Sequence, residues 1–233
     1  MKVLVACEES QAVCKAFREK GHEAYSADIQ DCSGGHPEWH ILGDVTEVLN
    51  PTADRYFRYS FFKNEQKGIS FETMDGQYHQ FAGGWDLIIA HPPCTYMSNA
   101  GAARLYPKKG ELNQERYEKG LQAKEFFMKF YNADCDKICI ENPIPTRIFG
   151  LPPYTQTIQP YEYSHPYSKK TCLWLKGLPE LTPTNIVEPI CSWVSGGSKD
   201  NHGNKRKNCG MTFRDSKTKS KTFPGIAKAM AEQ

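Results

Sequence analysis

The chain has 233 residues, of which 29 are lysine or arginine and 27 are aspartate or glutamate, so its formal net charge is only +2. This near balance argues against a protein that binds polyanions through its overall charge, and any nucleic-acid contact must be local. The length fits one α/β domain with a usable core and requires no second domain.

Cellular location is indicated by the N-terminus and by the cysteines. The first apolar run is interrupted by Glu8 and Glu9 too soon for a signal peptide, and no apolar run approaches the length of a membrane span. Nine cysteines without paired spacing are typical of a reduced cytosol rather than of a disulfide framework. We therefore expect a cytoplasmic protein with no membrane partner.

The first third of the chain alternates strand and helix patterns. Apolar runs predict strands at 2–6, 23–27 and 39–42, and Val13 and Phe17 lie at helical spacing in a segment closed by Gly21. Asp28 follows the second strand about 20 residues after the first turn, where nucleotide-binding sheets often hold ribose hydroxyls. We expect Asp28 to be such a ribose ligand.

A metal site is one interpretation of Cys32, His36 and His40, which lie at four-residue intervals. Gly34, Gly35 and a proline indicate an irregular loop there, and no fourth ligand lies nearby in the sequence. We therefore expect no metal.

Residues 52–83 are rich in aromatic side chains and contain one turn signal, Asp75-Gly76. The turn lies between the runs 69–73 and 77–81, which predicts an inserted hairpin. Its alternating aromatic residues are more typical of packing than of base stacking.

Two chemically reactive side chains follow predicted strands. The apolar run 87–90 ends at His91 and a Pro-Pro pair that presents Cys94, and a second run through Ile140 ends at Glu141 and Asn142. A lone cysteine is most often a small buried apolar residue. Parallel strands ending at the same edge would, however, bring this thiol and carboxyl together.

At these residues the chain resembles the DNA cytosine-C5 methyltransferases, whose Pro-Cys and Glu-Asn loops match Pro93-Cys94 and Glu141-Asn142. The resemblance is to a compact, phage-like form. It implies one α/β domain over residues 1–233 with the Rossmann-like S-adenosylmethionine-dependent methyltransferase fold, a mostly parallel seven-stranded sheet with helices on both faces. It also implies the cytoplasm of a bacterial or phage-infected host cell.

The reaction of that family explains the residue types. A thiolate adds to C6 of cytosine and N3 is protonated, which creates an enamine whose C5 attacks an electrophilic methyl group. The resemblance implies that Cys94 is the nucleophile and Glu141 the partner of N3. The thiol must be partly ionised to react.

The resemblance implies S-adenosyl-L-methionine as the cofactor. The Gly-rich first loop of the family is replaced here by residues 7–11, but this cofactor carries no phosphate to be cradled. Glu8 and Ser10 would alternatively cap the following helix. Asp44 matches the position that meets the adenine amino group. The expected cofactor-binding residues are Ala6, Cys7, Glu8, Asp28, Ile29, Asp44, His91, Pro92 and Thr222.

A basic segment and a long helix follow Cys94. Residues 95–110 mix small and basic residues and suit a mobile lid over a flipped base. A helix is expected at about 113–131, capped by Asn113. Its buried stripe should comprise Leu121, Phe126, Phe127 and Phe130.

The last part of the chain supplies the remaining substrate contacts. Strands are expected at 156–161 and 170–175, and Pro224 opens a C-terminal helix. Lys169 and Lys170 stand near the family's substrate-contacting arginines, although surface lysines without a role are the alternative. A basic segment near 190–221 is expected to contact phosphates. The expected substrate-binding residues are Ser98, Asn142, Lys169, Lys170, Lys205, Arg206 and Lys207.

The target-recognition domain of the family has no counterpart. Only about forty residues are available where it would stand, too few for an independent base-reading domain. We therefore expect methyl transfer to C5 of cytosine in DNA, with relaxed or short sequence preference or with specificity supplied by a partner protein. The alternatives are an exocyclic-amino methyltransferase, because Pro92-Pro93 also resembles that class, and a catalytically silent nucleic-acid or nucleotide-binding relative.

Overall fold

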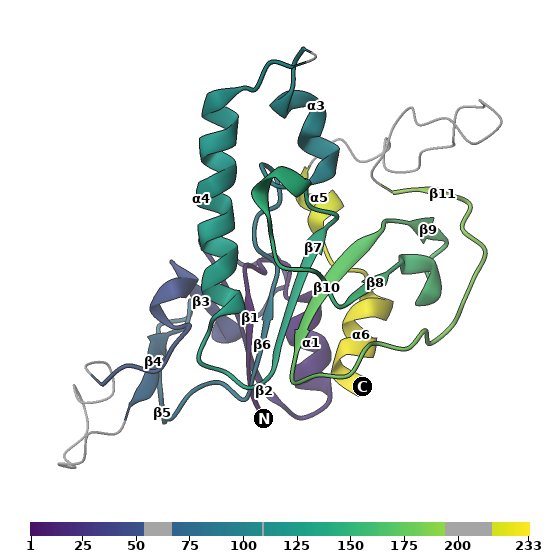
Figure 1. Cartoon of the computed structure of the whole chain (residues 1–233). Coiled ribbons are helices and arrows are strands. Elements are labelled where there is room, and N and C mark those ends of the chain that lie inside the picture. Colours follow the sequence, from purple (N-terminus) through teal and green to yellow (C-terminus); the bar gives the residue numbers. More distant parts are fainter. Residues whose placement is uncertain (54–66, 109, 194–215) are drawn as a thin grey trace.

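The computed structural model describes residues 1–53, 67–108, 110–193 and 216–233. Its centre is a seven-stranded sheet in the order β3-β2-β1-β6-β7-β10-β8 (Figure 1). The strands are β1 Lys2–Ala6, β2 Glu23–Asp28, β3 His40–Leu42, β6 Leu87–Ala90, β7 Ile138–Pro143, β8 Gln156–Ile158 and β10 Thr171–Lys176. Neighbours from β3 to β7 pair in parallel, whereas β10 is antiparallel to both β7 and β8. The predicted α/β class and the mostly parallel sheet are confirmed.

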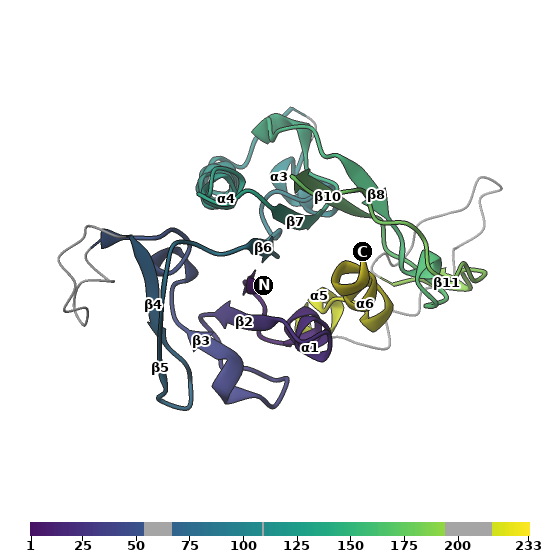
Figure 2. The ribbon, with the colours of Figure 1, turned by 90° about the horizontal axis from the view of Figure 1, so that it is seen from below.

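Helices cover both faces of this sheet (Figure 2). Helices α1 (Ala12–Glu19) and α6 (Pro224–Glu232) lie on one face, and α4 (Gln114–Tyr131) lies on the other. The shorter helices are η1 Pro37–Trp39, η2 Val45–Glu47, η3 Asn99–Gly101, α3 Ala102–Leu105, η4 Arg147–Phe149, η5 Pro160–Glu162 and α5 Ser216–Ser220. In the described part of the chain, no helix combines the length and the apolar character that crossing a membrane requires.

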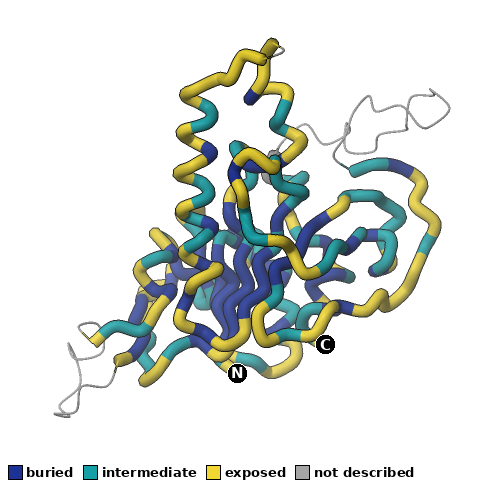
Figure 3. The backbone as a smooth tube through the Cα atoms, viewed as in Figure 1, coloured by how far each residue is buried: buried dark blue, intermediate teal, exposed yellow. Residues whose placement is uncertain are grey.

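Strand β1 shows why two separate cores form. Successive side chains of a strand point to opposite faces. Val3 and Val5 therefore pack in the core that contains Phe17 of α1, whereas Leu4 packs in the core that contains Phe127 of α4. The buried strands form the centre of the molecule in Figure 3.

The predicted hairpin is confirmed as β4 (Gly68–Glu72) and β5 (Tyr78–Ala82). Gly76 has φ 84°, a left-handed conformation that suits the turn. The Phe71 ring lies 4.8 Å from the Tyr25 ring and 5.8 Å from the Trp85 ring, centroid to centroid. The hairpin thus covers part of the sheet face that α4 leaves open, and these aromatic residues serve packing.

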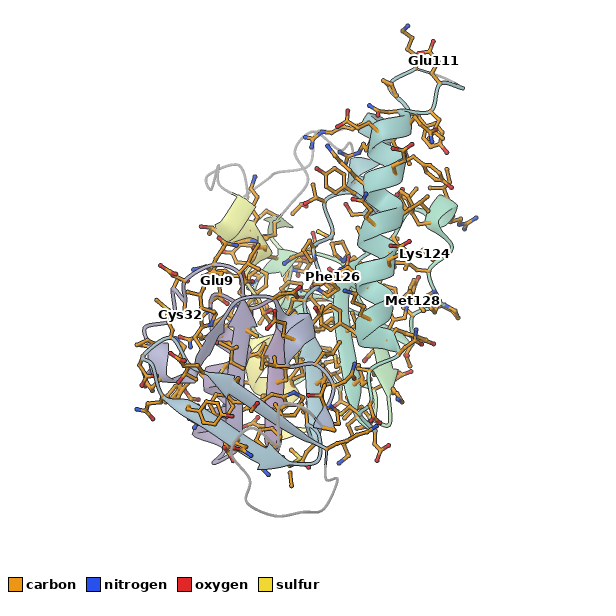
Figure 4. All side chains as sticks on the ribbon, turned by 90° about the vertical axis from the view of Figure 1, so that its left-hand side faces the viewer. Glu9, Cys32, Glu111, Lys124, Phe126 and Met128 are labelled. Atoms are coloured by element: carbon orange, nitrogen blue, oxygen red, sulfur yellow. The ribbon has the colours of Figure 1, made fainter. Side chains whose placement is uncertain are left out.

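Helix α4 is longer than the sheet that it covers. Its end toward Tyr131 packs on the strands, where Phe127 and Phe130 are fully buried. Its other end extends beyond the sheet, and Figure 4 shows Glu111 at the far tip of this arm. The predicted buried stripe is wrong at Leu121, which is 36% exposed, whereas its neighbour Gly120 is buried against Phe149. Leu121 therefore lies on a different face of α4 from the buried stripe.

The segment after Cys94 is more structured than the sequence indicates. It contains η3 and α3, Met97 is fully buried, and the Leu105 carbonyl oxygen accepts the backbone N–H of Asn113 at 2.9 Å. Residues 99–105, within the segment predicted as a mobile basic lid, are therefore helical, and buried Leu105 fixes them against the start of α4. Residue 109 lies outside the described residues.

A small two-stranded parallel sheet, β9 (Tyr167–Ser168) with β11 (Cys191–Ser192), lies beside β10. Cys191 is disulfide-bonded. The free cysteines among the described residues are Cys7, Cys14, Cys32, Cys94, Cys135, Cys139 and Cys172.

Candidate functional site

The order of the strands identifies the place where a ligand is expected. The chain runs from β1 outward to β2 and β3, then returns to β6 on the other side of β1. Open α/β sheets bind ligands beyond the carboxyl ends of the strands at such a switch point. The backbone N–H of His91 donates to the Ala6 carbonyl oxygen at 2.9 Å, so the segments leaving β1 and β6 are adjacent. The expected cofactor residues Ala6, Cys7, His91 and Pro92 all belong to these two segments.

Two further cofactor candidates lie beside Cys7. Burial raises the pKa of the Cys7 thiol, and the nearby carboxylates of Asp28 and Asp44 raise it further. One oxygen of Asp28 accepts the Gln30 N–H at 2.9 Å, and one oxygen of Asp44 accepts the Thr46 N–H at 2.9 Å. The ends of β1, β2 and β3 thus form one acidic group.

Ile29 adds an apolar surface to this acidic group. It follows Asp28 directly, and it is 79% exposed, the most exposed of the large apolar residues described. A carboxylate that can accept hydroxyl hydrogens, beside an apolar side chain, is chemically suited to a nucleoside: the ribose to Asp28 and the flat base to Ile29. The residues present therefore fit the adenosine part of S-adenosylmethionine.

The Glu8 carboxylate caps the first turn of α1, although Gln11 occupies the N-cap position. Glu8 Oε1 accepts the Val13 N–H at 2.7 Å, and Glu8 Oε2 accepts the Cys14 N–H at 3.1 Å. Burial raises the pKa of Glu8, although His91 and these N–H groups act in the opposite direction. The capping role that the sequence left open is confirmed. A direct contact between Glu8 and a cofactor would have to share oxygens that already bind the helix.

The loop that carries Cys94 is fixed from β7. The Cys94 carbonyl oxygen accepts the N–H groups of Met97 at 3.2 Å and Ser98 at 2.9 Å, which closes a tight turn. Asn142 Nδ2 donates to the Pro92 carbonyl oxygen at 2.8 Å. Asn142 and Ser98, both expected to contact the substrate, are buried, 3% and 7% exposed. In this structure they hold the shape of the loop.

Arg116 fixes the same loop from α4, and sequence reasoning missed it. Its Nη2 donates to the Thr95 carbonyl oxygen at 2.6 Å, and its guanidinium lies 5.1 Å from the centroid of the Tyr96 ring. A Cβ at Gly101 would approach Nη2 within 2.7 Å, so a larger residue there would require the guanidinium to shift. A signal was present: a cation in the first turn of a helix is unfavourable and needs a compensating contact.

The predicted catalytic pair is joined by a third residue. Glu141 Oε2 lies 2.8 Å from His91 Nδ1, and each of these side chains is 12% exposed. Burial raises the pKa of Glu141, but the hydrogen bond and charge of His91, with Lys169, bring it below its usual value. Burial and the charge of Glu141 raise the pKa of the Cys94 thiol. Cys94 and Glu141 are therefore close enough to interact electrostatically, as the sequence predicted.

Lys169 is the cation of the site. Its charge acts to lower the pKa of both Cys94 and Glu141, although the pKa of Cys94 stays raised because burial and Glu141 act in the other direction. Its Nζ donates to the Lys219 carbonyl oxygen at 3.2 Å and lies 5.9 Å from the centroid of the Phe223 ring. Lys170, predicted beside it, is exposed, and its charge acts on Cys172.

The C-terminal segment reaches the same edge of the sheet. Lys221 Nζ donates to Ser33 Oγ at 3.2 Å, and Ser33 N donates to the Glu9 carbonyl oxygen at 2.8 Å. Figure 4 shows Glu9 and Cys32 at this edge. Thr222, half-buried, follows Lys221 directly. Lys205, Arg206 and Lys207 lie outside the described residues.

The histidines of the rejected metal motif have protein partners. His40 Nδ1 lies 2.8 Å from Ser26 Oγ, and its Nε2 lies 2.9 Å from the Gln30 carbonyl oxygen. His36 Nδ1 lies 2.9 Å from Glu38 Oε1. The described residues contain no group of three histidine, cysteine or acidic side chains arranged to hold a metal ion.

Comparison with known proteins adds no family to these observations. No protein-family model matches the sequence, and no curated protein is significantly similar to it.

Proposed function

We propose that the protein transfers a methyl group from S-adenosylmethionine to carbon 5 of cytosine in DNA. One observation carries the proposal. Strands β6 and β7 pair in parallel, with Ala90 opposite Ile140, so that Cys94 after β6 and Glu141 near the end of β7 lie in one partly buried site. A nucleophile and a proton-transfer group in that relation are what addition to a pyrimidine ring requires.

The electrostatics of this pair support a coupled reaction. Glu141, while ionised, opposes ionisation of Cys94, and Lys169 favours it. A proton on Glu141 removes the opposing charge while the thiolate forms, and the carboxylate returns only when that proton passes to N3. The Cys94 thiol gives its proton to water, its sulfur forms a bond to C6, and the electron pair of the ring makes C5 nucleophilic as N3 takes its proton. When bound, the cofactor would supply an electrophilic methyl group for C5. Loss of the C5 proton to water would then restore the double bond and expel the thiolate.

The fold and the nucleoside-suited residues are consistent with this cofactor. A mostly parallel seven-stranded sheet with helices on both faces is what the resemblance to the cytosine-C5 methyltransferases implies. Asp28, Ile29 and Asp44 would hold the adenosine part, and the segments after Ala6 and Ala90 would hold the amino-acid part.

A polyanionic substrate is supported by two arginines around the Cys94 loop. Arg104 on α3 and Arg147 on η4 are exposed. Both lie on segments joined to the loop: α3 follows it, and η4 follows the Ser98–Pro145 bridge. Exposed arginines near a nucleophile suit contacts to phosphates, which position a protein on DNA without reading its sequence. Sequence specificity would then depend on a partner protein or remain relaxed.

A trapping experiment tests nucleophile and substrate together. In 5-fluorocytosine the C5 hydrogen is replaced by fluorine, so the loss of a C5 proton that would release the enzyme cannot occur. An oligonucleotide with 5-fluorocytosine should therefore remain covalently attached to the protein after methyl transfer. We expect a denaturation-resistant complex that Cys94→Ala abolishes and Cys32→Ala, a free cysteine outside the catalytic pair, preserves. Methyl label on an exocyclic nitrogen of unmodified DNA, or no transfer to cytosine at all, would overturn the proposal.

The Cys94→Ala protein also separates the nucleophile from the cofactor site. The thiol is proposed to attack the base and not to hold the cofactor. Its removal should therefore leave the affinity for S-adenosylhomocysteine nearly unchanged, as measured by calorimetry. Loss of both transfer and affinity would indicate that Cys94 is needed for the structure of the site instead.

A further inference from the structure

His91 is the residue of the site for which the proposed reaction has no role. Its ring forms a partly buried hydrogen bond to Glu141, 2.8 Å from Nδ1 to Oε2. The parallel pairing of β6 and β7 fixes this geometry, because each of the two residues directly follows a paired position, Ala90 or Ile140. An ionised carboxylate only accepts hydrogen bonds, so Nδ1 carries the proton when Glu141 is charged.

The charges around His91 come from three different elements. Glu141 faces it from β7, Glu8 from the turn between β1 and α1, and Lys169 from the segment between β9 and β10. Burial lowers the pKa of His91, but the hydrogen bond and charge of Glu141, with the charge of Glu8, raise it above its ordinary value. Glu8 is held in place by two N–H groups of α1. The imidazole therefore lies among two fixed carboxylates and one ammonium.

The two nitrogens of the ring differ in their surroundings. Nδ1 is bonded to Glu141, whereas Nε2 is buried and has no hydrogen-bond partner among the described residues. A proton can therefore leave the ring through one hydrogen bond that the structure provides, the one to Glu141.

We propose that His91 is a positioning residue that stores the proton which Glu141 delivers to N3 of the base, an inference that rests on the proposed function. Between turnovers His91 is doubly protonated and Glu141 is ionised. When a base binds, the Nδ1–H bond breaks and an O–H bond forms on Oε2; rotation of the carboxyl group presents this proton to N3. The O–H bond then breaks as N3–H forms and the Cys94 sulfur adds to C6. The proton that passes from His91 to N3 leaves His91 neutral, and the Cys94 thiol loses its own proton to water before its sulfur adds.

The first test requires neither DNA nor cofactor. In protein labelled with ¹⁵N-histidine, the His91 signals are identified by their loss in His91→Asn. Near neutral pH we expect both nitrogens of His91 to be protonated, and we expect Glu141→Gln to return the ring to its neutral form. A ring that is neutral at this pH, or whose titration is unchanged by Glu141→Gln, would overturn the inference whatever the protein methylates.

The second test measures the rate of covalent trapping on 5-fluorocytosine DNA against pH. Asparagine at position 91 can place an amide N–H near the position of Nδ1, but it has no proton to give. We expect His91→Asn to lower this rate tenfold or more with unchanged DNA affinity, and to change its dependence on pH.

His36→Asn is the matched control, because it removes an equivalent pair to Glu38, 2.9 Å long but at the surface. It should leave both rate and profile unchanged. If His91→Asn traps DNA at the wild-type rate and with the wild-type dependence on pH, the proposed role of His91 is overturned. If the wild-type protein traps no cytosine at all, the proposed function is overturned instead. The ¹⁵N result on His91 would still be valid in that case.

Discussion

The side-chain amide nitrogen of Asn142 lies 2.8 Å from the carbonyl oxygen of Pro92 and joins the strand that carries Glu141 to the loop that carries Cys94. Both ends of this bond are buried. The relative position of the proposed acid and nucleophile therefore depends on it.

Replacing Asn142 by Ala should weaken both the fold and the reaction. The buried Pro92 carbonyl would be left without its partner, which typically costs about 1–3 kcal/mol. We expect a decrease of that size in the free energy of unfolding in urea, and a lower rate of trapping on 5-fluorocytosine DNA. Asn99→Ala, at an exposed position of the same region, is the control and should change neither.

Arg116 gives a second test of loop geometry. Arg116→Ala removes the hydrogen bond to the Thr95 carbonyl oxygen and the packing of the guanidinium on the Tyr96 ring. We expect slower trapping with unchanged affinity for S-adenosylhomocysteine, measured by calorimetry. Lys119→Ala is the matched control, since Lys119 lies one turn along α4 and its Nζ is 5.9 Å from the centroid of the same ring. Equal effects of the two changes would show that only the charge of the arm matters.

The sheet could be predicted from the sequence because its strands are short apolar runs whose periodicity is local. The meeting of Cys94 and Glu141 could be predicted as well, since parallel strands end at the same edge. The exposure of Leu121 could not, because it depends on which face of α4 packs against Phe149 and the rest of the core. Nor could Lys169 be distinguished from Lys170, because a single residue of register decides which of the two faces the site.

Two interactions could not be predicted because they depend on the exact register or packing of distant segments, such as the pairing of Ala90 with Ile140 that places His91 beside Glu141. The His91–Glu141 hydrogen bond spans 50 positions, and no sequence pattern around either residue predicts the other as its partner. Arg116 bonds to Thr95 across 21 positions. Glu8 is a local case. A carboxylate in the turn before a helix can either cap that helix or bind a ligand, and only the structure shows that both oxygens of Glu8 accept N–H groups of α1.

Glu141→Gln should lower the rate of transfer by roughly two or more orders of magnitude, the usual scale of general acid catalysis. Single-turnover rates with saturating DNA and cofactor would measure it. Full activity in this variant would remove Glu141 from the mechanism.

His165 predicts how stability depends on pH. Its Nε2 accepts the Gly225 N–H at 3.0 Å near the start of α6, and burial lowers its pKa from the ordinary 6.5. The unfolded chain therefore binds this proton more readily than the folded one. The contribution is present above pH 6.5 and is lost as the pH falls below it. The urea-unfolding free energy of His165→Asn should accordingly fall less between neutral and mildly acidic pH than that of the wild type; equal falls would contradict the assignment.

The two arginines that flank the Cys94 loop give a test of DNA binding that does not depend on catalysis. If Arg104 and Arg147 bind phosphates, changing both to Ala should weaken binding similarly for every sequence, because phosphates carry no base information. The slope of log affinity against log salt should also decrease, by about 0.9 for each phosphate of duplex DNA that the protein no longer neutralises.

Lys20→Ala is the control for this double variant, since Lys20 pairs with Glu232 at 2.6 Å and lies directly after α1, outside the segments that flank the Cys94 loop. It should leave the slope as it is in the wild type. An unchanged slope in the double variant would mean that DNA does not lie across α3 and η4. A changed sequence preference with an unchanged slope would mean that these arginines read bases instead.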